Sequence, residues 1–134
     1  MLKKFCDEEG QLIALVVRSG FHKDGVEFFT PNDFSQQLGY LHQQKGKVIP
    51  AHTHNVVDRR ARVTQEVLFI RQGRVKVDLY TSTQTFLASV ELTAGDVILL
   101  ASGGHGLTML EPTEIIEVKQ GPYSGDHDKT QFSP

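Results

Sequence analysis

The chain has 134 residues, the usual size of a single domain that buries its own hydrophobic core. Its net charge of −2 at pH 7 and its scattered basic residues create no field that would gather phosphates, so we expect no nucleic-acid partner. No apolar run approaches the roughly 20 residues of a membrane-spanning helix, and the first residues do not form the apolar segment of a signal peptide, so we expect a cytoplasmic protein without a membrane partner.

The first half of the chain consists of short β-rich runs separated by turn residues, which is typical of an all-β protein. Residues 12–17 form a continuous apolar run, and the turn at 7–10 predicts a hairpin that joins this run to residues 2–5. Residues 28–34 hold three phenylalanines and predict a plug against one face of a sheet, with or without a short helical turn. The alternating residues 37–44 predict a further strand.

The second half of the chain continues the same pattern. Its clearest hairpin signal joins residues 66–70 to residues 75–80 through a turn at Gly73. Alternation in the second of these strands places three aliphatic side chains inward: Val75, Val77 and Leu79. Further short strands are expected at residues 86–92, 97–100, 106–110 and 114–119. About nine or ten strands at this spacing favour a closed barrel or jelly roll, because closure removes exposed strand edges, with an immunoglobulin-like sandwich as the rival.

We expect one barrel domain over residues 1–123, followed by a polar tail over residues 124–134. The tail is expected either to be loosely ordered or to pack against a partner subunit. The single cysteine, Cys6, has no partner for an internal disulfide and is interpreted as a plain thiol. His22 and His127 lie in polar, turn-like surroundings, and we expect both side chains to be exposed to solvent.

Two histidines, two residues apart, are the first candidates for chemistry. In a strand, His52 and His54 would project from the same face a few ångströms apart, which is the spacing that a shared metal ion requires. Pro50 predicts an edge or the start of a strand, which would leave these side chains free to face a cavity. Ordinary packing also explains a His-x-His pair, so a metal site requires further ligands.

Glu66 and His105 are the further ligands that the sequence offers. Glu66 lies by alternation on an apolar face, and an unpaired buried carboxylate is costly, so it is expected either to bind a cation or to keep its head in water. His105 lies in a Gly-rich segment whose backbone freedom lets an imidazole approach from a second direction. Three imidazoles and one carboxylate suit a divalent ion of iron, manganese, nickel, copper or zinc. The predicted metal ligands are His52, His54, Glu66 and His105.

These residues resemble the two sequence motifs of the cupin superfamily. The segment 46–73 resembles the first motif, in which a glycine and five further residues precede His-x-His, and a Glu is followed after six residues by Gly. Eleven residues, 55–65, separate the second histidine from Glu66, so a loop is inserted. The segment 94–109 resembles the second motif, with alanines in place of its two prolines and with His105 one residue early. The resemblance implies a double-stranded β-helix, or jelly-roll barrel, with a metal ion inside one mouth.

The inserted loop would lie next to the metal if the residues on both sides of it are ligands. Its Arg60 and Arg62 are candidates to bind a carboxylate or phosphate of a substrate. The alternative is a solvated loop that pairs with acidic residues of a second subunit. Tyr40, His42 and Met109 are further candidates for the pocket lining, and the first two are equally well explained as core residues with satisfied polar groups.

The resemblance implies a small metalloenzyme that acts on a small polar molecule such as a sugar or sugar derivative. Its reaction would be that of an isomerase, an epimerase or a dioxygenase. Two alternatives remain open: a non-catalytic protein that binds a small ligand through its metal, and a closed structural metal site. Small cupins commonly pair, so we expect a homodimer in which the run at residues 12–17 contributes to the interface.

Overall fold

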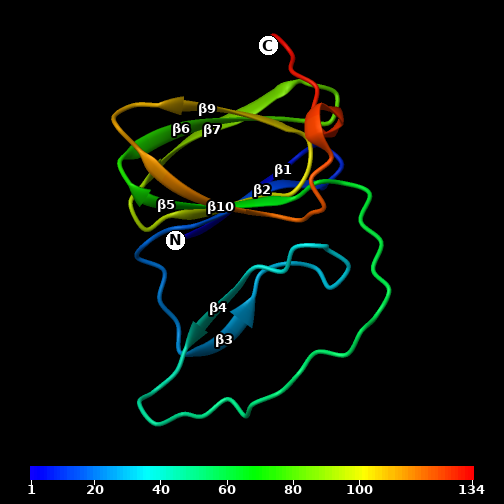
Figure 1. The fold of residues 1–134 in the computed structure, drawn as a ribbon. Helices are drawn as coiled ribbons and strands as arrows, with labels where there is room; N and C mark the ends of the chain where they lie inside the picture. Colours follow the sequence, from blue (N-terminus) through cyan, green and yellow to red (C-terminus); the bar gives the residue numbers. More distant parts are fainter.

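The computed structural model describes the backbone of residues 1–134 and every side chain except that of Asp126. Within that description the chain is all-β, with ten strands and one short 3₁₀ helix (Figure 1). The strands are β1 (Leu2–Cys6), β2 (Leu12–Val17), β3 (Gly25–Phe28), β4 (Gly39–His42), β5 (Glu66–Gln72), β6 (Arg74–Tyr80), β7 (Phe86–Thr93), β8 (Val97–Leu100), β9 (Gly104–Met109) and β10 (Glu114–Lys119). The 3₁₀ helix, η1, spans Gly125–Asp128. The same description contains no helix long and apolar enough to cross a membrane.

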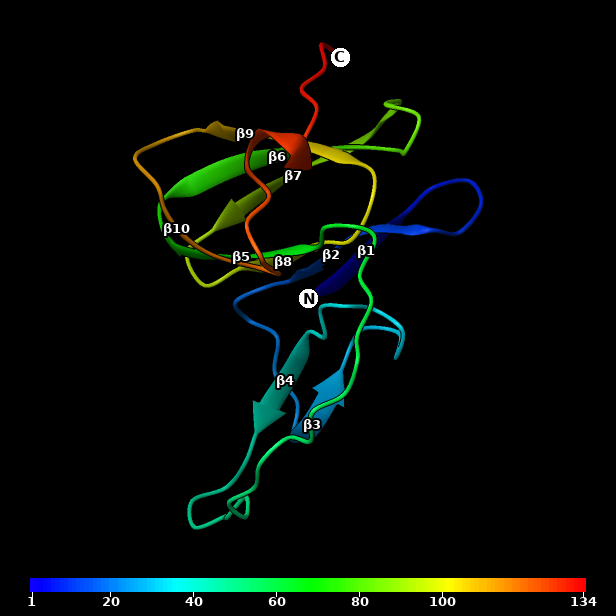
Figure 2. The same cartoon turned by 45° about the vertical axis from the view of Figure 1, so that its right-hand side comes forward.

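The strands form three antiparallel sheets. One sheet has the order β1-β2-β8-β5-β10, another has the order β7-β6-β9, and β3 pairs with β4. Figures 1 and 2 show the two larger sheets stacked face to face, with the β3–β4 hairpin projecting to one side of them. The all-β prediction is confirmed. The expected closed barrel is not found among the described residues, because β9 and β10 remain edge strands and residues 43–65 form no strand that bridges them.

Aliphatic side chains fill the space between the two larger sheets. Val75, Val77 and Leu79 of β6 point into this space and are fully buried, as alternation predicts. They pack with fully buried side chains of the neighbouring strands, among them Ile13, Ile70, Leu92 and Ile98. We call β1, β2 and β5 to β10 the body, because these strands form the two sheets that enclose this core.

A second, smaller core lies on the outer face of the five-stranded sheet. Leu15 of β2 and Leu99 of β8 are fully buried there, and Phe29 packs against them. Phe21 lies edge-on to Phe29 and to Tyr40, with ring centroids 5.3 and 5.0 Å apart. The predicted aromatic plug is confirmed for Phe29 and Phe34, whereas Phe28 is 57% exposed. This second core attaches the β3–β4 hairpin to the body.

The pairing of the second predicted hairpin is wrong. β5 and β6 follow each other through the turn at Gly73, as predicted, but they enter different sheets and do not pair. Gly73 has a φ of +96°, and a Cβ atom there would lie 2.3 Å from the carbonyl oxygen of Pro112. The turn is therefore pressed against the loop before β10, and it sends the chain across the core to the opposite sheet.

Residues 21–64 form an arm between β2 and β5. The predicted strand over residues 37–44 is the shorter β4, and its partner β3 was not expected from the sequence. The alternative of a helical turn after residue 32 is not realised, because a single hydrogen bond of 3.1 Å from Phe34 N to Pro31 O closes a tight turn. After β4, residues 43–65 have no regular secondary structure and return to β5 in a wide loop (Figure 1).

Candidate functional site

Glu66 and His105 meet at one end of the space between the two larger sheets. Glu66 is the first residue of β5 and shares the inward face of Leu68 and Ile70, as alternation predicts. His105, the second residue of β9, pairs with the inward-facing Leu79. Glu66 Oε2 lies 3.0 Å from His105 Nε2, and only 16% of the glutamate side chain and 31% of the histidine side chain are exposed. The structure therefore brings two of the four predicted ligands into contact.

A cation and a second carboxylate extend this pair. Lys119 is the cross-strand neighbour of Glu66 at the end of β10, and its Nζ lies 3.9 Å from Glu66 Oε1 and 3.9 Å from Asp128 Oδ2. Asp128 belongs to η1 and accepts a hydrogen bond of 3.0 Å from the hydroxyl of Thr64. These contacts tie the C-terminal segment to the start of β5, so side chains from distant parts of the chain share one small region.

The contact with His105 controls the charge of Glu66. Hydrogen bonding with His105 is the main cause that lowers the pKa of Glu66 to about 2, while burial acts in the opposite direction. Hydrogen bonding with Glu66, together with burial, raises the pKa of Glu117. Glu66 is therefore ionised at neutral pH, and it offers a negative charge to any cation that approaches.

The pair faces an open hollow with a volume of about 1280 Å³. The walls come from the Gly-rich turn before β9, the last residues of the arm and the C-terminal tail. The polar lining includes Arg62, Thr64, Gln84, His127 and Gln131. On the tail side, Phe132 packs edge-on against Tyr80 with ring centroids 5.1 Å apart. Such a surface suits a small molecule with several hydroxyl or anionic groups better than an apolar one.

The chemistry of Glu66 and His105 fits a divalent first-row ion, because an ionised carboxylate and an imidazole are ligands that such ions prefer. Ions of this kind take about four ligands or more, and the pair supplies two. Among the described side chains, the pair belongs to no group of three His, Cys, Asp or Glu residues whose ligand atoms lie close together. The body by itself therefore supplies two potential ligands, fewer than such an ion requires.

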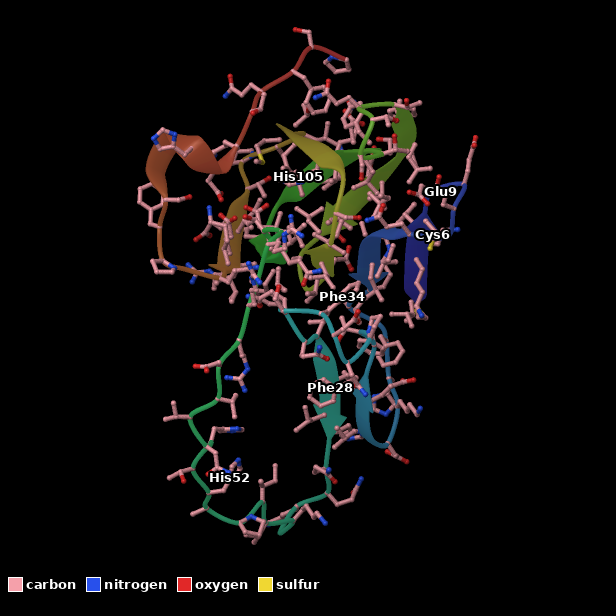
Figure 3. All side chains as sticks on the ribbon, turned by 90° about the vertical axis from the view of Figure 1, so that its right-hand side faces the viewer. Cys6, Glu9, Phe28, Phe34, His52 and His105 are labelled. Atoms are coloured by element: carbon pink, nitrogen blue, oxygen red, sulfur yellow. The ribbon has the colours of Figure 1, made fainter. Side chains whose placement is uncertain are left out.

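His52 and His54, the other two predicted ligands, lie elsewhere. Both are exposed on the loop 43–65, and Figure 3 shows His52 at the end of the arm that is remote from His105. Their ring centroids are 5.2 Å apart, and His52 Nδ1 lies 2.8 Å from the carbonyl oxygen of Pro50. The loop leads these residues away from the body before it returns, so the predicted four-residue site is not assembled within this one chain.

The other pocket candidates are divided between two regions. Arg60 lines a smaller hollow of about 560 Å³ between the arm and the start of β2, and Arg62 lines both this hollow and the one described above. Tyr40 packs with aromatic side chains at the base of the hairpin and so takes the alternative role of a core residue. Met109, at the far end of β9, is 51% exposed and does not line the hollow.

The arm carries a second group of potential ligands, which contains the pocket candidate His42. Ligand atoms of His22, Asp24 and His42 all lie within 4.8 Å of one another. His42 Nδ1 lies 3.2 Å from Asp24 Oδ1, although no hydrogen bond forms. His22 is exposed, as expected from the sequence, and 84% of the Asp24 side chain is exposed. This group lies at the surface of the hairpin and does not contribute to the hollow.

Sequence analysis missed Lys119 and Asp128. Alternation in the last strand places Glu117 and Lys119 on one face, which is the available signal. The neighbour of Lys119 depends on the register between β10 and β5, which the sequence does not reveal. Asp128 lies in the tail, where no periodic pattern indicates a direction for the side chain.

A buried amide network fixes the base of the arm, and it too was missed. Gln65 is only 3% exposed. Its Oε1 accepts hydrogen bonds from Ser35 Oγ and Gln36 N, at 3.2 and 3.0 Å. Gln120 Oε1 accepts a hydrogen bond from Gln65 N, while Gln120 Nε2 donates to Ser35 Oγ and to Val63 O. The network joins residues 35–36 and the last residues of the arm to Gln120, the residue after β10.

Compared with known protein families, with curated proteins and with solved structures, the chain has no match. Its function is therefore argued from the contact between Glu66 and His105 and from the hollow that surrounds them.

Proposed function

We propose that this chain is a small metalloprotein of the cupin type that binds one divalent ion through Glu66 and His105 and holds a small polar molecule beside it. The observation that carries the proposal is the 3.0 Å contact between a carboxylate of one sheet and an imidazole of the other, at a polar hollow. The two stacked antiparallel sheets and the motif resemblance support a jelly-roll relationship. A sugar or sugar derivative is the substrate class that this lining favours.

The residues around the pair have distinct roles in this proposal. Glu66 is held ionised and so retains the charge that binds a cation. Lys119 and Arg62 supply positive charge to anionic or hydroxyl oxygens of the bound molecule. A bound divalent ion would polarise an oxygen atom of that molecule or of water. Isomerisation, epimerisation or dioxygenation is the reaction class that we propose for this arrangement.

One observation favours a second candidate function, the metal-free binding of an anion. Lys119 Nζ lies 3.9 Å from Glu66 Oε1, and its positive charge opposes the approach of a metal cation to the same carboxylate. Without a metal, Lys119 and Arg62 supply the positive charge at the hollow that would bind an anion. A small phosphate or carboxylate compound would then be bound and not converted.

Metal content tests the first candidate against the second. Purified protein is analysed for metals, then stripped with a chelator and titrated with Zn²⁺ or Mn²⁺ by calorimetry. We expect about one ion per chain and a loss of at least tenfold in affinity for His105→Ala, since one lost ligand commonly costs that much. His127→Ala, which changes an exposed histidine of the same hollow, is the matched control and is expected to keep the ion. Stripped protein that takes up neither ion but is stabilised by phosphate would overturn the metal assignment in favour of anion binding.

A further inference from the structure

We propose that His52 and His54 complete the metal site of a second copy of this chain, so that two copies exchange their arms. The inference rests on the proposed metal function, since it assigns the missing ligands of that site. Each arm would place residues 47–57 along the free edge of β9 in the partner, beside the contact between Glu66 and His105.

The first observation is a long segment of β-forming sequence that has no partner within the chain. Residues 43–65 have no regular structure, although loops longer than about 15 residues are uncommon in compact domains. The segment exposes large apolar side chains, including Val48 at 72%, Ile49 at 57% and Val56 at 101%. β-branched residues favour strands, and exposing them in a loop has no benefit for an isolated chain. The segment therefore has the composition of a strand that lacks its sheet.

The second observation is a sheet edge that lacks its strand. β9 pairs with β6 on one side, and no described strand lies on its other side. Leu107 and Met109 are 37% and 51% exposed, although their cross-strand neighbours Val77 and Val75 are fully buried. A strand added beside β9 would cover these side chains. Its own inward residues, two positions apart as His52 and His54 are, would face the space that contains His105.

The third observation is a pair of matching apolar surfaces, one on the arm and one on the body. The hairpin exposes Val26, Phe28 and Leu41 at 49%, 57% and 53%. The outer face of the five-stranded sheet exposes Phe69, Ile116 and Val118 at 39%, 47% and 55%. Phe69 is directly opposite Ile116, so this second surface is continuous across β5 and β10. If the hairpin of each copy packed on the outer sheet face of the other copy, both apolar surfaces would be buried in a two-fold symmetric dimer.

Charge favours the same exchange. Residues 43–62 contain five basic side chains and one acidic one, which gives a formal charge of +4. The whole chain carries −2, so the remainder of the chain carries −6. The cationic segment 43–62 is therefore attracted to the anionic remainder of another copy.

The arm has no access to β9 of its own chain in this fold. Figures 1 and 2 show β3 and β4 on one side of the molecule and β9 on the opposite side. Gln65 and Gln120 fix the end of the arm, and the aromatic contact between Phe21 and Tyr40 fixes its base. In this fold residues 47–57 therefore lie away from β9 of their own chain, as Figure 3 shows for His52 and His105. A second copy can offer the free edge, the apolar surface and the missing ligands to the arm as it stands.

Complementation between two defective chains tests the exchange. One chain carries His52→Ala and His54→Ala, the other carries Glu66→Gln and His105→Ala, and one of them is labelled with ¹⁵N. The two are co-refolded, loaded with Zn²⁺ and examined by native mass spectrometry, which resolves the three dimers and counts their ions. In the mixed dimer, exchanged arms combine the intact histidine pair of one chain with the intact Glu66 and His105 of the other, which gives one complete site. The mixed dimer should therefore hold one ion, half the wild-type content, while both pure dimers should hold none.

The outcomes separate this inference from the metal function on which it rests. If the wild-type dimer binds Zn²⁺ and the mixed dimer does not, the ligands come from one chain and the exchange is overturned. A wild-type monomer that binds Zn²⁺ would lead to the same conclusion. A wild-type dimer that takes up no Zn²⁺ would instead overturn the metal function. His22→Ala with His42→Ala is the control for the surface group on the hairpin, and loss of the ion in that variant would place the metal there.

A variant of the hairpin surface supplies a readout that does not depend on metal. Leu41→Asp should convert the dimer to a monomer, as measured by light scattering, because a charge on the packed surface opposes association. Leu2→Asp, which changes an exposed leucine of β1 at the opposite edge of the five-stranded sheet from β10, should leave the dimer intact. A Leu41→Asp protein that stays dimeric with a circular dichroism spectrum of the wild-type form would contradict the proposed packing.

Discussion

The body and the arm use similar residues in different ways. In the body, inward-facing aliphatic side chains such as Ile70 and Leu92 are fully buried between two sheets. In the arm, Val26 and Leu41 face each other across the hairpin and remain about half exposed. A two-stranded hairpin is marginally stable by itself in water. The comparison teaches that the body encloses its core between two sheets, whereas the hairpin is attached to it through an aromatic cluster and keeps other apolar side chains exposed.

The sharpest test of this difference compares a core deletion with an arm deletion. Ile70→Ala should lower the free energy of unfolding by about 3 kcal/mol, because a buried aliphatic side chain leaves a cavity. Leu41→Ala should lower it only at protein concentrations at which dimers form. Urea unfolding at several protein concentrations measures both. An equal, concentration-independent loss for the two variants would remove the distinction between body and arm.

The junction of the two regions gives the next largest effect. Asp96 is 2% exposed and accepts hydrogen bonds from the backbone N–H groups of Ser19 and Thr93, both at 2.8 Å, and from Arg18 at 3.1 Å. Asp96→Ala should lower the free energy of unfolding by about 2 kcal/mol, since buried donors lose a charged acceptor. Hydrogen exchange at the Ser19 N–H group should become faster in the same variant, because this group loses its acceptor. Asp33→Ala, a change within the exposed part of the arm, is the control and should have little effect.

Acid should weaken the body through Glu66. Its pKa is lowered to about 2 in the folded chain, so its ionised form stabilises the fold above the ordinary carboxyl range, and this contribution is lost as the pH falls toward 2. Glu117 acts in the opposite sense, because its pKa is raised. The urea concentration at the midpoint of unfolding is measured between pH 5 and pH 2, with a chelator present to remove metal ions. As the pH falls, this midpoint should decrease less steeply for Glu66→Gln than for the wild type. Parallel profiles for both proteins would contradict the contact with His105.

The smallest expected effect concerns the tail. A Cβ atom on Gly104 would lie 3.0 Å from the Phe132 ring, so this aromatic ring lies directly on the first residue of β9. Phe132→Ala should cost about 1 kcal/mol or less, as expected for the loss of a partly exposed aromatic contact. Limited proteolysis should then cleave the tail faster while the body stays intact. Gly104→Ala should give the same cleavage pattern, and an unchanged pattern in both would show that the tail is held elsewhere.

Periodicity was sufficient to predict most strands of the body. The inward positions of β6 and the face of Glu66 follow from alternation alone, because one buried face imposes a period of two. Sheet membership did not follow, since the turn at Gly73 is compatible with a hairpin and with a crossing to the other sheet. Only the packing of Pro112 against Gly73 distinguishes the two.

The candidate site was predictable in part for a similar reason. Glu66 and His105 are strand residues whose faces are set by their apolar neighbours, and the structure brings them together. Lys119 depends on a register that forms only when β10 pairs with β5. His52 and His54 lie in a segment without a sheet in this chain, so no local rule determines where their side chains point. The spacing of the two histidines identified them as a pair. It did not predict their position, because that depends on contacts between the loop and other parts of the structure.

The course of the C-terminal tail has a practical consequence. Phe132 and Pro134 line the same hollow as Glu66 and His105, so a purification tag fused after Pro134 would begin at its rim. A hexahistidine tag in that position would bring six imidazoles within reach of the hollow and produce metal content that does not originate from the protein. Tags for this chain therefore belong at Met1, which lies beside Gly20 and away from the hollow, and they should be cleaved before any ion is counted.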